Sequence, residues 1–63
     1  FGFVLIHNHP SGDPSPSTAD QAFTRQLKQG SELLGLRFVD HIIIGRPAPA
    51  REAYYSFREY GLL

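Results

Sequence analysis

The sequence contains no cysteine, so no disulfide or thiolate ligand is available, and any metal site must use His, Asp or Glu. Its 6 Lys and Arg residues balance its 6 Asp and Glu residues. Nucleic-acid binders usually carry a basic excess, so charge leaves nucleic-acid binding open but gives it no support. There is no secretory signal and no apolar run near the roughly 20 residues that span a bilayer, so we expect a cytoplasmic protein without membrane contact.

The chain has 63 residues and is at most one small domain. A chain of this size buries only roughly 60% of its unfolded surface, and its stability is marginal. It starts with Phe1 instead of Met, and its first residues are already strand-like. We therefore expect that the chain belongs to a longer protein.

The pattern of apolar and loop-forming residues predicts an α/β fold. Apolar, β-prone runs at residues 1–6 and 37–44 predict strands that are buried on both faces. Between them, the Pro- and Gly-rich run at 10–17 predicts a loop, and a helix should follow it. A third, short strand is predicted at 54–57, after a Pro- and Ala-bearing loop. The expected order is strand, long loop, helix, strand, strand.

The helix is predicted from about Ser17 to Leu34. Ser17 is a favourable N-cap, and Asp20 stands three residues later, where a carboxylate completes a capping box. Gly35 is a suitable residue to end the helix. Residues four, three and four apart form one helical face: Phe23, Leu27, Gly30 and Leu34. We expect this face to pack on the sheet, with its glycine at a point of close contact.

Two histidines at the end of the first strand are candidate metal ligands. In an extended chain residues two apart point to the same side, so the imidazoles of His7 and His9 can reach one zinc ion at about 2.0–2.1 Å. Asp20, in the first turn of the helix, is the candidate third ligand, because the preceding loop can fold that turn back over the strand. Two His and one carboxylate leave a tetrahedral position for water, which is typical of catalytic zinc.

The same residues also allow a structural interpretation. Paired histidines often hydrogen-bond at a strand end, and Asp20 already has a role as the acidic partner of the capping box. Spacing alone does not decide between the two interpretations. The contiguous His-Asn-His run does not fit the HNH nuclease motif, whose three residues are dispersed over a ββα unit.

The residues His7, His9, Ser17 and Asp20 fit the signature H-x-H-x7-S-x2-D at every defined position, and the chain resembles the JAMM-type (JAB/MPN+) metalloprotease-like domain of the RadC family. The runs HNHPSGDPSPS, LLGL, DHIIIG, YYSFRE and GLL resemble the same family, so the resemblance covers nearly the whole chain. It implies a three-layer, cytidine-deaminase-like α/β domain, of which residues 1–63 would form the C-terminal half.

The resemblance also implies a function, that of a zinc-dependent hydrolase that cleaves peptide or isopeptide bonds. His7, His9 and Asp20 would hold Zn²⁺, and Ser17 would stabilise the oxyanion in addition to capping the helix. The family's general base is a glutamate on an earlier strand, and no acid precedes His7, so we expect this chain alone to be inactive. Two alternatives remain: a non-catalytic DNA repair or recombination factor, as the family's name implies, and a metal-stabilised interaction module.

Other polar and aromatic residues are expected to be structural. His41 lies in the second strand and is expected to be a structural histidine and not a ligand. Tyr54, Tyr55 and Phe57 are expected to pack against the sheet instead of stacking on bases. The loop GRPAPAREA looks longer than the turn expected in this family, which affects the local geometry there but not the metal ligands.

Overall fold

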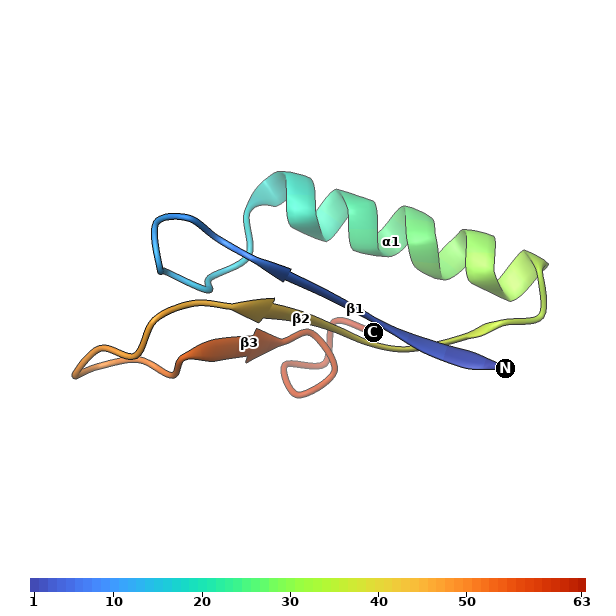
Figure 1. The fold of residues 1–63 in the computed structure, drawn as a ribbon. Coiled ribbons are helices and arrows are strands. Elements are labelled where there is room, and N and C mark those ends of the chain that lie inside the picture. The colour runs from blue at the N-terminus through green and yellow to red at the C-terminus, as the bar shows by residue number, and fades with distance from the viewer.

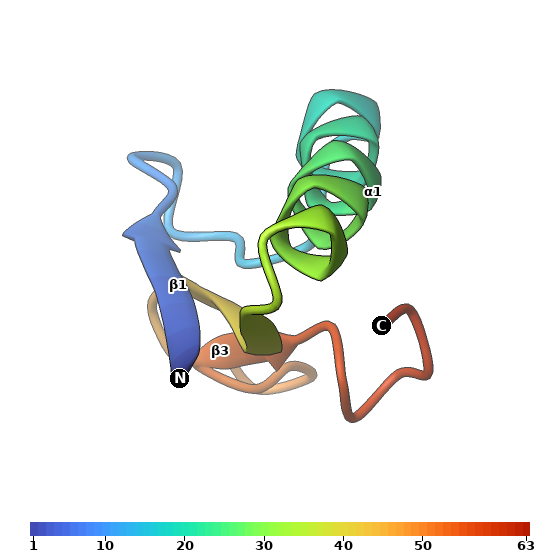
Figure 2. The same cartoon turned by 90° about the vertical axis from the view of Figure 1, so that its right-hand side faces the viewer.

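The computed structural model describes all 63 residues, with β1 (Gly2–Asn8), α1 (Thr18–Leu33), β2 (Arg37–Ile44) and β3 (Tyr54–Ser56) in chain order. β2 is the central strand of a mixed sheet, parallel to β1 and antiparallel to β3. α1 connects the two parallel strands and lies over one face of the sheet (Figure 1 and Figure 2). The predicted α/β fold and element order are confirmed, with a sheet and one helix as two layers.

Local hydrogen bonds define both ends of α1 as predicted. At its start, Ser17 Oγ accepts from the Asp20 N–H at 3.0 Å, and Asp20 Oδ2 accepts from the Ser17 N–H at 2.8 Å, which completes the capping box. At its end, Gly35 adopts a φ of 71°, and the N–H of Leu36 donates to the Ser31 carbonyl at 2.8 Å. This is a Schellman motif, in which glycine adopts the left-handed conformation without a Cβ clash.

The face of α1 that packs on the sheet is not the predicted one. Thr24 and Ser31 are its buried residues, and Leu27 is half-buried. Phe23 and Leu34 of the predicted face are 50% and 76% exposed. The prediction is therefore wrong for Phe23 and Leu34, whereas Leu27 and Gly30 are half-buried. The helix is rotated so that a more polar face meets the sheet.

Hydrogen bonding explains this rotation. Asp20 and Thr24 lie one helical turn apart on the same face, and each contacts a histidine of the sheet side. Leaving such partly buried polar groups unpaired costs about 1–3 kcal/mol each, which competes directly with the gain from burying Phe23. Gly30 is also not a point of close contact, because a Cβ placed there would meet nothing within 4 Å.

Burial along β1 alternates, so the prediction of burial on both faces is wrong in this chain. Phe3 and Leu5 are half-buried on the side of the helix, whereas Val4 and Ile6, on the opposite face, are 44% and 60% exposed. β1 is an edge strand, and Figure 2 shows α1 over one face of the sheet only. Along β2, Ile44 is likewise exposed.

The core is small and contains a large polar share. Its buried apolar side chains are Phe38, Ile43 and Phe57, and its buried polar side chains are Thr24, Ser31, His41 and Ser56. Every buried side-chain nitrogen and oxygen has a hydrogen-bond partner. These hydrogen bonds allow the core to be so polar, because an unpaired buried polar group would destabilise the fold. No helix has the length and apolar character needed to cross a bilayer.

Candidate metal centre

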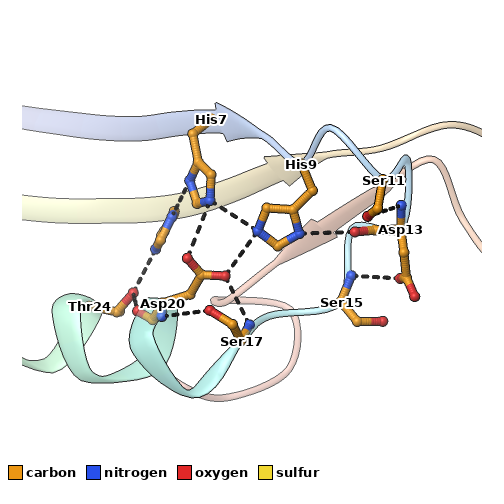
Figure 3. A network of polar contacts seen from close by, with 9 residues as sticks. His7, His9, Ser11, Asp13, Ser15, Ser17, Asp20 and Thr24 are labelled. Atoms are coloured by element: carbon orange, nitrogen blue, oxygen red, sulfur yellow. Dashed lines mark hydrogen bonds and ion pairs between the residues drawn. The ribbon is translucent and has the colours of Figure 1, made fainter.

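The end of β1 presents two imidazoles on one side. His7 is part of β1, and His9 follows it with extended geometry, because its N–H still donates to the Ile44 carbonyl of β2 at 3.2 Å. Asn8, between the two, is exposed. The Nε2 atoms of His7 and His9 lie 3.3 Å apart, as the two-residue period predicted (Figure 3).

Contacts between two loops bring the start of α1 back over this strand end. Gly12, with a φ of 85°, accepts at its carbonyl from the Arg46 N–H at 2.7 Å and from Arg51 Nη2 at 3.0 Å. A Cβ on Gly45 would collide with the same carbonyl oxygen, so only glycine allows this approach. The loop after β2 thereby holds the loop before α1, and with it the first turn that carries Asp20.

Asp20 completes a group of three potential ligands. Its Oδ2 lies 3.0 Å from His9 Nε2, and its Oδ1 lies 3.4 Å from His7 Nε2. The ligand atoms of the three residues all lie within 4.8 Å of one another. In a tetrahedral site with bonds of 2.0–2.1 Å, neighbouring ligand atoms are about 3.3–3.4 Å apart. The spacing in this group fits a zinc-sized ion, so the predicted residues do form a group that can hold a metal.

The protonation of the group also favours a cation. His9 Nδ1 lies 2.9 Å from the Asp13 carbonyl, which can only accept, so Nδ1 carries a proton. His9 Nε2 lies 3.0 Å from Asp20 Oδ2, so a metal ion could replace a proton between these two atoms. Burial raises the pKa of Asp20, but the hydrogen bonds from Ser17 and the neighbouring His7 and His9 lower it further, so the net pKa is below its usual value. Once both Nε2 atoms are deprotonated, their lone pairs face the Asp20 carboxylate, and a metal ion in their place would offset the repulsion between these groups.

Ser17 stands next to this group at the N-terminus of α1. Its Oγ accepts from the Asp20 N–H, so the capping role is present. That bond uses a lone pair of the hydroxyl, which leaves the proton free to be donated. Ser17 is exposed, and its role toward a substrate oxyanion stays a prediction.

His41 lies behind His7 and outside the ligand group, in agreement with the structural interpretation. Its Nε2 is 2.9 Å from His7 Nδ1, and its ring stacks on Phe57 with centroids 4.4 Å apart. The side chain is 1% exposed. This burial, followed by the proximity of His7, lowers the pKa of His41 and so favours the neutral form of the ring.

The aromatic residues near β3 pack largely as predicted. Phe57 is buried, and Tyr55 meets its ring edge-on while stacking on Tyr60 with centroids 4.4 Å apart. Tyr54 is more exposed, and its hydroxyl donates to Glu59 at 3.1 Å. The packing role is therefore confirmed for Phe57 and Tyr55.

The sequence analysis did not identify Thr24 as a part of this site. Its Oγ1 lies 2.6 Å from His41 Nδ1, so it contacts the histidine that stands behind a ligand. The available signal was its position four residues after Asp20, which places both on one face of the helix. The apolar residues of the neighbouring face dominate the periodicity of the helix and mask this signal.

Comparisons with known proteins point to one family. The family model described as RadC-like JAB domain matches residues 1–62. A UPF0758 protein of Thermotoga maritima is 50% identical over 62 residues, which cover 98% of this chain and 26% of that protein. A UPF0758 protein of Aquifex aeolicus is 47% identical over 62 residues, covering 98% of this chain and 25% of that protein. The chain spans about a quarter of the length of these curated relatives.

Proposed function

The chain belongs to the family of RadC-like JAB domains, and on this premise we propose that it carries the metal-binding part of a zinc-dependent hydrolase of peptide or isopeptide bonds. One observation carries the proposal: His7, His9 and Asp20 converge with spacings that suit a tetrahedral zinc ion. Two histidines and one carboxylate are also the ligand types that catalytic zinc sites use while keeping a position open.

Each residue of the proposed site has its own role. His7 and His9 would bind the metal through Nε2, and Asp20 would bind it through its carboxylate. When bound, zinc supplies a Lewis acid for a carbonyl oxygen and a nucleophile at neutral pH. The Ser17 N–H holds the Asp20 carboxylate at 2.8 Å and so keeps its orientation fixed before any metal arrives.

Ser17 is the proposed donor to the substrate. As an amide carbonyl becomes tetrahedral, negative charge develops on its oxygen, and a hydroxyl donor in place beforehand stabilises it. Ser17 combines an available proton with a position at a helix N-terminus, where backbone N–H groups also favour negative charge.

The test compares zinc content and hydrolysis in the full-length protein. We expect stoichiometric zinc by elemental analysis in the wild type and in the matched control Asn8→Ala, which alters only the exposed residue between the histidines. His7→Ala should lose the zinc. The wild type should cleave a general peptide or an isopeptide-linked substrate, and a chelator should abolish this turnover.

Two results would contradict the proposal. Zinc retained by His7→Ala would show that the ligand set is wrong. Zinc bound by the wild type without any amide hydrolysis would instead favour the metal-stabilised interaction module. The other alternative, a DNA repair or recombination factor, would require DNA binding that the balanced charge does not favour.

A further inference from the structure

A buried chain of hydrogen bonds links the helix backbone to His7. Thr24 Oγ1 donates to the Asp20 carbonyl at 2.9 Å and lies 2.6 Å from His41 Nδ1. His41 Nε2 in turn lies 2.9 Å from His7 Nδ1. Thr24 and His41 are 2% and 1% exposed, so water does not compete for the contact between them, whereas the His7 side chain is partly exposed. Figure 3 shows dashed contacts leading from His7 toward Thr24 on α1.

The chemistry of the partners indicates which atom donates and which accepts in each of these hydrogen bonds. A carbonyl can only accept, so the single hydroxyl proton of Thr24 goes to the Asp20 carbonyl. Thr24 Oγ1 must then accept from His41, which places the His41 proton on Nδ1. The neutral His41 ring has a bare Nε2, which accepts from Nδ1–H of His7. The last step leaves Nε2 of a neutral His7 bare.

His7 Nε2 is the atom that faces Asp20 and His9. We propose that Thr24 and His41 are positioning residues that fix the tautomer of His7, so that its Nε2 lone pair is presented to the metal in advance. This inference rests on the metal site of the proposed function. It assigns a task to two residues that are not ligands and do not touch the substrate.

The tautomer of His9 is fixed in a similar way, but by a single hydrogen bond. His9 Nδ1 donates directly to the Asp13 carbonyl, so a backbone acceptor presents its Nε2 in the same way. For His7 the last acceptor in the series is the backbone carbonyl of Asp20. The side-chain carboxylate of the same Asp20 lies near His7 Nε2. Two ligands from β1 and α1 are thus joined into one closed ring of contacts.

Thr24→Val tests the proposal, because valine keeps the shape of threonine and removes the hydroxyl. Thr24→Ser is the matched control, since it keeps the hydroxyl. The first readout is the tautomer of His7 in the metal-free, full-length protein, measured from the ¹⁵N chemical shifts of labelled histidine side chains. The wild type and Thr24→Ser should show His7 protonated on Nδ1, and Thr24→Val should show a mixture of tautomers.

The second readout is zinc affinity, measured by competition with a chelator of known affinity. Loss of an outer hydrogen-bond partner typically weakens metal binding 10–100-fold, so we expect Thr24→Val to bind zinc at least about tenfold more weakly than Thr24→Ser. Wild-type protein with His7 protonated on Nε2 would overturn the inference, and this result does not depend on how well the valine variant folds. Unchanged tautomer and affinity in Thr24→Val would also overturn it.

These outcomes are distinct from a failure of the proposed function. The tautomer is read without metal and without substrate, so it reports on Thr24 and His41 even if the protein hydrolyses nothing. Conversely, a confirmed tautomer in a protein that binds zinc and cleaves no amide bond would support the positioning role and reject the hydrolase.

Discussion

At the residue scale, the structural and functional interpretations of Asp20 are compatible. Its Oδ2 accepts from the Ser17 N–H at 2.8 Å as part of the capping box, and the same carboxylate lies within 3.0–3.4 Å of both His7 and His9. A carboxylate has about four lone-pair sites, so it can cap the helix and still offer an oxygen to a metal. The cap therefore orients the ligand and does not compete with it.

Ser17 offers a way to separate capping from catalysis. Glycine at an N-cap costs only a few tenths of a kcal/mol, and it keeps the backbone N–H that holds Asp20. Ser17→Gly should therefore retain zinc affinity and nearly all stability, but lose turnover about 10²–10³-fold, as expected for a missing oxyanion donor. Ser17→Thr keeps both cap and hydroxyl and should remain active. Normal turnover in the glycine variant would restrict Ser17 to capping.

Sequence reasoning identified these residues because their geometry is local. The two-residue period of a strand places His7 beside His9, and the three-residue spacing of a capping box places Asp20 beside Ser17. Thr24 was not identified, because its partner His41 is 17 residues away in the chain. Only the packing of α1 on β2 creates that contact.

At the element scale, the ends of α1 could be predicted, but its orientation could not. Ser17 and Gly35 fix the ends through hydrogen bonds within a few residues. The rotation about the helix axis depends on which side chains find partners across the interface. Phe23 fits the apolar stripe but has no partner there, whereas Thr24 reaches His41. The apolar periodicity of a helix does not reveal which polar side chains need hydrogen-bond partners in the interface.

Asp40 ties β2 to β3 and to the turn that follows. Its Oδ2 accepts from Ser56 Oγ at 2.5 Å, and its Oδ1 accepts from the backbone N–H of His41 at 2.7 Å and of Arg58 at 3.0 Å. Ser56 is buried, so it has no water to replace the carboxylate. The hydrogen bonds of Asp40 with Ser56 and Arg58 thus join the run DHIIIG to the run YYSFRE.

Asp40→Ala should destabilise the protein by about 1–3 kcal/mol, because it leaves the proton of the buried Ser56 hydroxyl without an acceptor. The measurement is the free energy of unfolding from urea titration of the full-length, metal-free protein. Glu59→Ala is the control, since it removes an exposed hydrogen bond with Tyr54 and should change stability by no more than about 0.5 kcal/mol. Similar losses in the two variants would show that Asp40 does not join these elements.

At the scale of the whole molecule, the chain has few means of stabilising itself. Its buried apolar side chains number three, and Val4, Ile6 and Ile44 leave the second face of the sheet exposed. A metal at His7, His9 and Asp20 would tie the end of β1 to the start of α1. Because such a site forms only in the folded state, the free energy of metal binding would add to the stability of the fold.

The acidic residues of the 63-residue chain bear on whether it could turn over a substrate alone. None except Asp20 belongs to the ligand group. The carboxylate of Asp40 is occupied by three donors, and that of Glu59 accepts from Tyr54. Glu32 lies twelve residues beyond Asp20 on the helix, roughly 18 Å along its axis at 1.5 Å per residue. The Asp13 carboxylate accepts from the Ser15 N–H at 3.0 Å, Glu52 is exposed in the loop before β3, and neither belongs to the ligand group. We therefore expect no second carboxylate of this chain to move a proton at the metal centre.

The 63-residue chain, prepared alone and loaded with zinc, should therefore be a poor hydrolase. Amide hydrolysis needs a proton to pass from the attacking water to the leaving amine, and a positioned general acid–base contributes about 10²–10⁴-fold to such a step. We expect turnover at least about 10²-fold below that of the full-length protein, with peptide and isopeptide-linked substrates at matched zinc content. A chelated sample of each protein gives the background. If the zinc-loaded chain has the same turnover as the full-length protein, its own residues suffice for proton transfer. The role assigned to a glutamate beyond these 63 residues would then be wrong.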